Sequence, residues 1–155
     1  MKILIPLLGK TRSPWIEAGI RDYAERLRRY AELEMPVLRE RHSPGAPPER
    51  TMLLQAEELS RCIAGAPLAV TLEPEGRAVS SEALAGLLDR WEGQGRGTLV
   101  FCIGGHLGLH PSLTARAAFR LSLSQMTFTH EMSRLILVEQ LYRACTIRAG
   151  HPYHL

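Results

Sequence analysis

The sequence predicts an α/β fold with a mainly parallel sheet and helices on both of its faces. Short apolar runs at 1–8, 67–72 and 98–103 have no polar alternation, which is typical of strands buried on both faces. The segments between them carry apolar residues at helical spacing. Strands and helices alternate along the chain, which is the pattern of a parallel sheet. The 155 residues are 45% hydrophobic and contain no linker or repeat, so a single domain over 1–155 is expected.

In the first part of the chain, residues 1–8 predict a strand that is closed by Gly9. Pro6 cannot donate to a strand ladder, so a bulge or the end of the strand is expected there. Ser13 and Pro14 suit the N-cap and the first position of a helix. The apolar stripe of that helix is Ile16, Ile20, Tyr23, Leu27 and Tyr30. Residues 35–41 predict a second strand, and 42–48, with three prolines and a glycine, predict a loop.

In the rest of the chain, residues 49–64 return to helical spacing and Gly65 is placed to cap that helix. Residues 67–72 predict a strand, and 73–76 predict a turn. Ser80 or Ser81 starts a helix with the apolar stripe Leu84, Leu87, Leu88 and Trp91. Residues 98–103 form the most apolar strand, and 131–146 predict the last helix.

Composition sets broad limits on function. The formal charge is +3, and Lys2 and Lys10 are the two lysines among 19 basic residues. Arginine suits phosphate contacts and stacking on bases, so the charge permits an RNA partner without requiring one. Cys62, Cys102 and Cys145 lie far apart without a CxxC pair, which favours buried thiols over disulfides or a metal site. The N-terminal run lacks a signal cleavage site and no run is long enough to span a bilayer, so we expect a cytoplasmic protein.

Three segments follow or interrupt predicted strands, where parallel sheets bind ligands. They are 72–74, the glycine loop 104–109, and 123–130, which has no apolar period. The glycine loop is neither a GxGxxG fingerprint nor a phosphate-binding P-loop. Glycines let a ligand approach the backbone, and irregular backbone offers unpaired polar groups. A tight strand-to-helix turn and an ordinary connecting loop remain the alternatives for these two loops.

The C-terminal tail has two histidines and a tyrosine within its last residues, His151, Tyr153 and His154. Chain ends usually fray. These side chains and the terminal carboxylate could instead form part of a site, provided that the last helix anchors them near the glycine loop.

The joint pattern of three runs resembles the RlmH family of bacterial ribosomal RNA methyltransferases. The runs are IGGHLGLH at 103–110, LSLSQMTFTHEMSRLILVEQLYRA at 121–144 and HPYH at 151–154. The start MKILI, the run TLEPEG and the length agree as well, so the resemblance covers essentially the whole chain. It implies a SPOUT-type fold with a C-terminal trefoil knot, S-adenosylmethionine as cofactor, a homodimer, and methylation of N3 of a pseudouridine in large-subunit (23S) ribosomal RNA.

The same resemblance implies which residues bind the cofactor. They are Leu72, Gly104, Gly105, Leu123, Ser124, Gln125, Met126, Thr127 and Phe128. The family commonly has proline where this chain has Thr129 and often a basic residue where it has Leu155. The change at Thr129 affects the loop expected to bind the cofactor. The change at Leu155 removes a side-chain cation from the end of the chain.

The catalytic candidates follow from the chemistry. An imide nitrogen is mostly protonated at neutral pH, so a base must take its proton or donors must stabilise the anion. We expect His154 to be the base, Tyr153 to stack or hydrogen bond, and Arg143 to neutralise charge. The alternative is a ribosome-binding assembly or silencing factor without catalysis, and binding of S-adenosylmethionine would distinguish the two.

Overall fold

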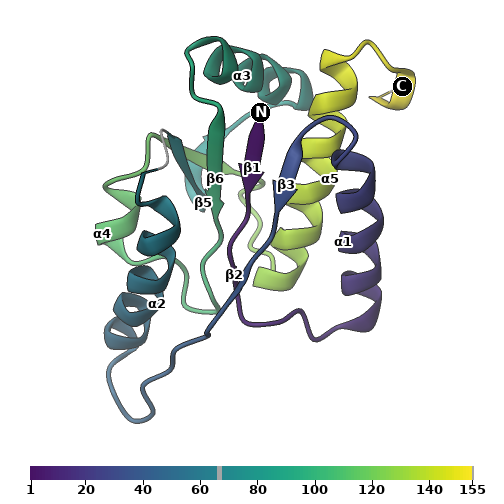
Figure 1. Cartoon of the computed structure of the whole chain (residues 1–155). Coiled ribbons are helices and arrows are strands. Elements are labelled where there is room, and N and C mark those ends of the chain that lie inside the picture. Colours follow the sequence, from purple (N-terminus) through teal and green to yellow (C-terminus); the bar gives the residue numbers. More distant parts are fainter. Residues whose placement is uncertain (66–67, 155) are drawn as a thin grey trace.

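The computed structural model describes residues 1–65 and 68–154 and shows a five-stranded sheet in the order β3-β1-β6-β5-β7 (Figure 1). These strands are β1 (Lys2–Leu4), β3 (Glu32–Glu34), β5 (Leu68–Ala78), β6 (Thr98–Cys102) and β7 (Phe119–Ser122). A second ladder pairs β2 (Leu7–Leu8) with β4 (Val37–Leu38). The named strands of the described part pair in parallel throughout, which confirms the predicted mainly parallel sheet.

Helices cover both faces of the sheet, as predicted (Figure 1). One face packs against α1 (Pro14–Leu27), α3 (Ser81–Gly93) and α5 (His130–Arg148), and the other against α2 (Pro48–Ile63) and α4 (Pro111–Thr114). A short 3-10 helix, η1 (Pro152–His154), follows α5. The central strand β6 shows why the run 99–102 is apolar: Leu99 and Phe101 face one cluster, whereas Val100 and Cys102 face the other.

The first strand ends near Pro6, as predicted. Strand pairing resumes at Leu7 as β2, after residues 5 and 6. The predicted strand at 35–41 is wrong in its bounds, because the chain pairs with the sheet earlier, as β3, and then over two residues as β4. Pro36 lacks an N–H, so it interrupts the run, while its carbonyl accepts a hydrogen bond from the N–H of Leu7 at 2.9 Å. The predicted first residue of strand 67–72 lies outside the described residues.

The predicted turn at 73–76 is also wrong, because β5 continues to Ala78. Leu72 and Arg77 both pair with Leu121, so the residues between them form a bulge in a continuing strand. Gly76 permits this bulge, since a Cβ there would lie 2.7 Å from the carbonyl carbon of Leu121. The Ser122 hydroxyl donates to the carbonyl of Pro74 at 3.0 Å. The bulge therefore keeps 73–76 against the end of β7 rather than reversing the chain.

The helix ends agree with the prediction to within a few residues. Ser80 caps α3 by accepting a hydrogen bond from the N–H of Ala83. The short helix α4 is not among the predicted helices. The last helix begins one residue early and ends two residues late, at Arg148. Thr129 caps α5 through its hydroxyl, 3.2 Å from the N–H of Met132. A residue that departs from the family pattern thus makes a favourable helix start.

The three cysteines are free, as predicted, although Cys62 is only half-buried. Burial raises the pKa of Cys102 to about 12, so this thiol is protonated near neutral pH. Among the described residues, no group of histidine, cysteine and acidic side chains is arranged to hold a metal ion, and no helix could cross a membrane.

Candidate functional site

One cavity of about 590 Å³ opens at the carboxyl ends of the adjacent strands β6, β5 and β7. All three segments selected from the sequence contribute to its wall, together with the first turns of α5. The lining residues are Leu72, Glu73, Pro74, Ile103, Gly104, Gly105, His106, Gly108, Leu123, Ser124, Met126, Thr127, Phe128, Thr129, His130 and Ser133. A cavity of this size and mostly apolar lining suits a small-molecule ligand.

The glycine loop after β6 folds back on itself within a few residues. The N–H of Gly108 donates to the carbonyl of Gly105 at 3.0 Å, and Gly108 has a φ of 85°. A Cβ at Gly104 would lie 2.4 Å from the carbonyl carbon of Gly108 and 2.8 Å from the nitrogen of Leu109. Gly104 is therefore required by the turn itself, in addition to leaving backbone exposed to the cavity.

The segment between β7 and α5 forms another wall of the cavity. Residues 123–129 lie outside helices and strands, so their backbone polar groups are not committed to a regular ladder and can serve a ligand. The Ser124 hydroxyl accepts a hydrogen bond from the N–H of Met126 at 2.9 Å, which shapes the turn. Met126 is 74% exposed, and Gln125 is exposed and does not line the cavity.

Three titratable side chains line the cavity: Glu73, His106 and His130. Burial opposes ionisation of Glu73, but hydrogen bonds from Arg120 and Thr71 outweigh it and lower the pKa of this carboxyl. The Arg120 Nη2 lies 2.6 Å from Glu73 Oε2. Burial, and then the nearby Arg134, lower the pKa of His130. Near neutral pH the cavity therefore holds a carboxylate and a neutral imidazole, which is an environment compatible with a cationic ligand.

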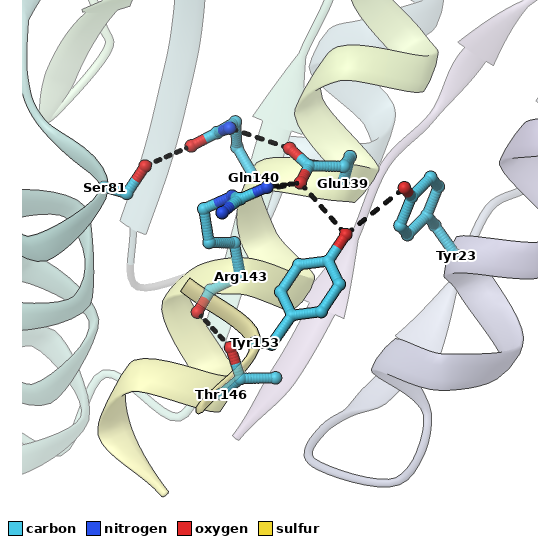
Figure 2. A network of polar contacts seen from close by, with 7 residues as sticks. All are labelled: Tyr23, Ser81, Glu139, Gln140, Arg143, Thr146 and Tyr153. Carbon is cyan, nitrogen blue, oxygen red and sulfur yellow. Dashed lines mark hydrogen bonds and ion pairs between the residues drawn. The ribbon is translucent and has the colours of Figure 1, made fainter. Parts of the chain in front are cut away.

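The tail docks onto α5 through a polar network that Figure 2 shows. The Tyr153 hydroxyl lies 3.2 Å from that of Tyr23 and 3.3 Å from Glu139 Oε1. Glu139 also accepts two hydrogen bonds from Arg143, at 3.0 and 2.7 Å. The Arg143 guanidinium carbon lies 4.8 Å from the centre of the Tyr153 ring. Burial, and then Tyr23 and Glu139, raise the pKa of Tyr153, so this phenol donates hydrogen bonds and is not a base.

The structure does not bring the tail to the cavity of the same chain. A site that combines the tail with the glycine loop within one chain is therefore not formed by the described residues. His130 and Ser133 on the first turns of α5 line the cavity, whereas Arg143 lies ten residues further along the helix, about 15 Å at 1.5 Å per residue. His151 also packs at the far end, where its Nδ1 lies 2.7 Å from the hydroxyl of Tyr30. The His154 side chain is outside the part that the structure describes.

Of the nine residues expected to bind the cofactor, the cavity wall contains all but Gln125. Ser133 lies outside the three segments selected from the sequence. Ser133 lies three residues after His130 at the start of α5, so the two side chains share one helix face. That spacing is the signal that could have identified Ser133. Ile103, the last residue before the glycine loop, was read only as part of a strand.

A family model described as a predicted SPOUT methyltransferase matches residues 1–154. The chain belongs to this family. The SPOUT methyltransferase described here is 45% identical to the ribosomal RNA large subunit methyltransferase H of Desulfotalea psychrophila. It is 40% identical to the protein of the same name from Geobacter sp. (strain M21), and 43% identical to a putative one from Methanoregula boonei. Each alignment covers 99% of both chains.

Solved structures agree with this fold. A probable methyltransferase from Bordetella pertussis has a TM-score of 0.56 at 14% identity, covering 93% of this chain and 95% of its own. A probable methylase family protein from Haemophilus influenzae has a TM-score of 0.53 at 12% identity, covering 96% and 66%. At these identities the likeness concerns the arrangement of the sheet and helices. The expected methyltransferase family and α/β fold are confirmed, and the trefoil knot stays a prediction.

Proposed function

We propose that this SPOUT methyltransferase transfers a methyl group from S-adenosylmethionine to N3 of a pseudouridine in large-subunit ribosomal RNA. The observation that carries the proposal is the cavity at the ends of β6, β5 and β7. Eight of the nine residues that the RlmH resemblance selects for the cofactor surround it. The names of relatives that are 40–45% identical over the full length support the choice of RNA.

The cavity offers the kinds of contact that a methionine-linked nucleoside needs. Leu72, Leu123 and Phe128 offer apolar surface to a flat base, and the irregular backbone at 123–128 offers N–H and C=O groups to its edge. The Glu73 carboxylate, which Arg120 holds by hydrogen bonds, would offer negative charge to a positively charged group of the bound cofactor. When bound, the cofactor supplies an activated methyl group, and the task of the cavity is to orient that methyl in line with the attacking nitrogen.

The reaction forms a bond between N3 and the methyl carbon, breaks the methyl–sulfur bond, and releases the N3 proton. We propose that His154 accepts that proton, that Tyr153 donates a hydrogen bond to the base or stacks on it, and that Arg143 stabilises negative charge on the ring oxygens. The raised pKa of Tyr153 supports the role of donor. Arg143 is held against Glu139 in the docked tail through its Nε and Nη2 groups.

The separation of tail and cavity along α5 supports a homodimer in which one copy's tail lies beside the cavity of the other, where it meets the RNA base. Two large apolar side chains stand exposed near the cavity: Trp15, 65% exposed, and Met126. The start of α1 lies beside the start of α5, because the N–H groups of Arg12 and Ser13 both donate to Glu131. A second copy would cover these side chains and bring a tail to the cofactor.

We expect the purified protein to bind S-adenosylmethionine and to methylate ribosomes that lack the modification. Isothermal titration calorimetry measures the first, and transfer of a labelled methyl group to RNA followed by nucleoside mass spectrometry locates the second. Absence of cofactor binding would contradict the proposal and favour a ribosome-binding factor without catalysis. Methylation at a position other than N3 of a pseudouridine would contradict the assignment of the substrate.

Sedimentation equilibrium at micromolar concentration is expected to give twice the 17.3 kDa mass of one chain. Trp15→Glu should shift this equilibrium toward the monomer, because a charge would be buried at the proposed contact. Glu25→Gln, an exposed position ten residues further along the same helix, is the control and should stay dimeric. A wild-type monomer under these conditions contradicts the dimer.

A further inference from the structure

Gln55, on α2, lies buried directly behind the glycine loop. Its side chain is 2% exposed, and its carboxamide oxygen Oε1 has no hydrogen-bond partner. Over residues 1–65 and 68–154, it is the one buried side-chain nitrogen or oxygen in this condition. Buried polar atoms are nearly always paired, and an unpaired one opposes folding. An unpaired amide oxygen at this place therefore points to a partner that arrives in another state of the protein.

The free oxygen faces the wall of the cavity. A Cβ built on Gly105 would lie 2.7 Å from Gln55 Oε1 and 3.2 Å from Nε2, so the amide packs against the backbone of a residue that lines the cavity on its other side. The amide nitrogen Nε2 is directed elsewhere, toward the carbonyl of Arg41 at 3.5 Å. The oxygen Oε1 is therefore available to accept a hydrogen bond from the glycine loop.

The loop in front of Gln55 is rich in glycine. It contains three glycines within five residues, 104, 105 and 108, and glycine backbone rotates with few steric limits. Rotation of a peptide in this loop changes the direction in which its N–H points. A ligand that takes up the loop's carbonyl and N–H groups on the cavity side would favour one such arrangement.

We propose that Gln55 is a positioning residue for the cofactor. When S-adenosylmethionine occupies the cavity, a backbone N–H of residues 104–107 donates to Gln55 Oε1, and this bond holds the loop against the ligand. The inference rests on the proposed function, because it takes the cavity as the cofactor site. It assigns to α2, which contributes nothing to the cavity wall, a part in cofactor affinity.

The proposal predicts opposite effects on folding and on binding. Gln55→Met has a similar shape and removes the unpaired oxygen, so the unliganded protein should melt at the same temperature or higher. The same variant cannot accept the bond from the loop, so the Kd for S-adenosylmethionine should rise about 3- to 10-fold. Gln55→Glu, which burial keeps protonated, has the same shape as glutamine and retains a carbonyl acceptor at this place and a donor toward the Arg41 carbonyl. It should bind within about twofold of the wild type. Gln94→Met, exposed at the end of α3, is the matched control and should change neither quantity.

The measurements are calorimetric titration with S-adenosylmethionine and thermal unfolding without ligand. A Gln55→Met variant that binds like the wild type overturns the inference and leaves the proposed function intact. Parallel loss of melting temperature and affinity overturns it too, because it indicates a packing role. A loss in Gln55→Glu as large as in Gln55→Met shows that an acceptor at this position does not support cofactor binding, which also overturns it. A wild-type protein that does not bind the cofactor overturns the proposed function and this inference together.

Discussion

Gly104→Val should abolish binding of S-adenosylmethionine while leaving the sheet and helices folded. The physical reason lies within the loop: a Cβ at this position would lie 2.4 Å from the carbonyl carbon and 2.6 Å from the carbonyl oxygen of Gly108. Both are backbone atoms, so no side-chain rotation relieves the contact, and the turn that forms the cavity wall must open. Because the loop follows the end of β6 rather than interrupting it, the core stays intact.

The measurement is calorimetric titration of the variant, with circular dichroism to confirm its helical content. Gly86→Ala is the matched control, since a Cβ at that exposed helical position meets nothing within 4 Å. It should bind like the wild type and be slightly more stable, because alanine favours helix over glycine by up to about 1 kcal/mol. Wild-type affinity in Gly104→Val would show that the cofactor site is elsewhere.

Deleting residues 151–155 should leave the affinity for S-adenosylmethionine nearly unchanged and remove methyl transfer. The cofactor is expected to contact residues at the strand ends, whereas the tail docks at the other end of α5 on Tyr23, Tyr30 and Glu139. Loss of acid–base help alone is worth on the order of 10² to 10⁴ in rate, and lost positioning adds to that. The test is a methylation assay on ribosomes lacking the modification, beside calorimetry of the same protein.

Two further measurements separate catalysis from assembly. Sedimentation of the truncated protein must show the same association state as the wild type, so that lost activity reflects the tail's chemistry. Tyr153→Phe removes only the hydroxyl that contacts Tyr23 and Glu139, and should reduce the rate less than the deletion. Normal methylation by the truncated protein would show that the tail is an ordinary chain end and that the catalytic assignment is wrong.

Much of the fold could be predicted because its signals are local. Uninterrupted apolar runs predict strands with both faces buried, and β6 has that environment. Ser80 and Pro14 mark helix starts through their own chemistry. The three site segments were found for the same reason, since ligands bind where parallel strands end. The error at 73–76 arises where pairing with another strand overrides a local turn signal. The error at 35–41 arises where the chain pairs with the sheet earlier and Pro36 interrupts the run.

The sequence by itself determined the alternation of strands and helices, and the loops that were candidates for a ligand, because spacing and turn residues act within a few positions of the chain. Only the tertiary structure decided which distant groups meet. It placed Gln55 of α2 behind Gly105, kept Gln125 out of the cavity wall, and set the tail at the opposite end of α5 from the cofactor loops. Such contacts depend on the packing of elements far apart in the chain, which no local pattern of residues encodes.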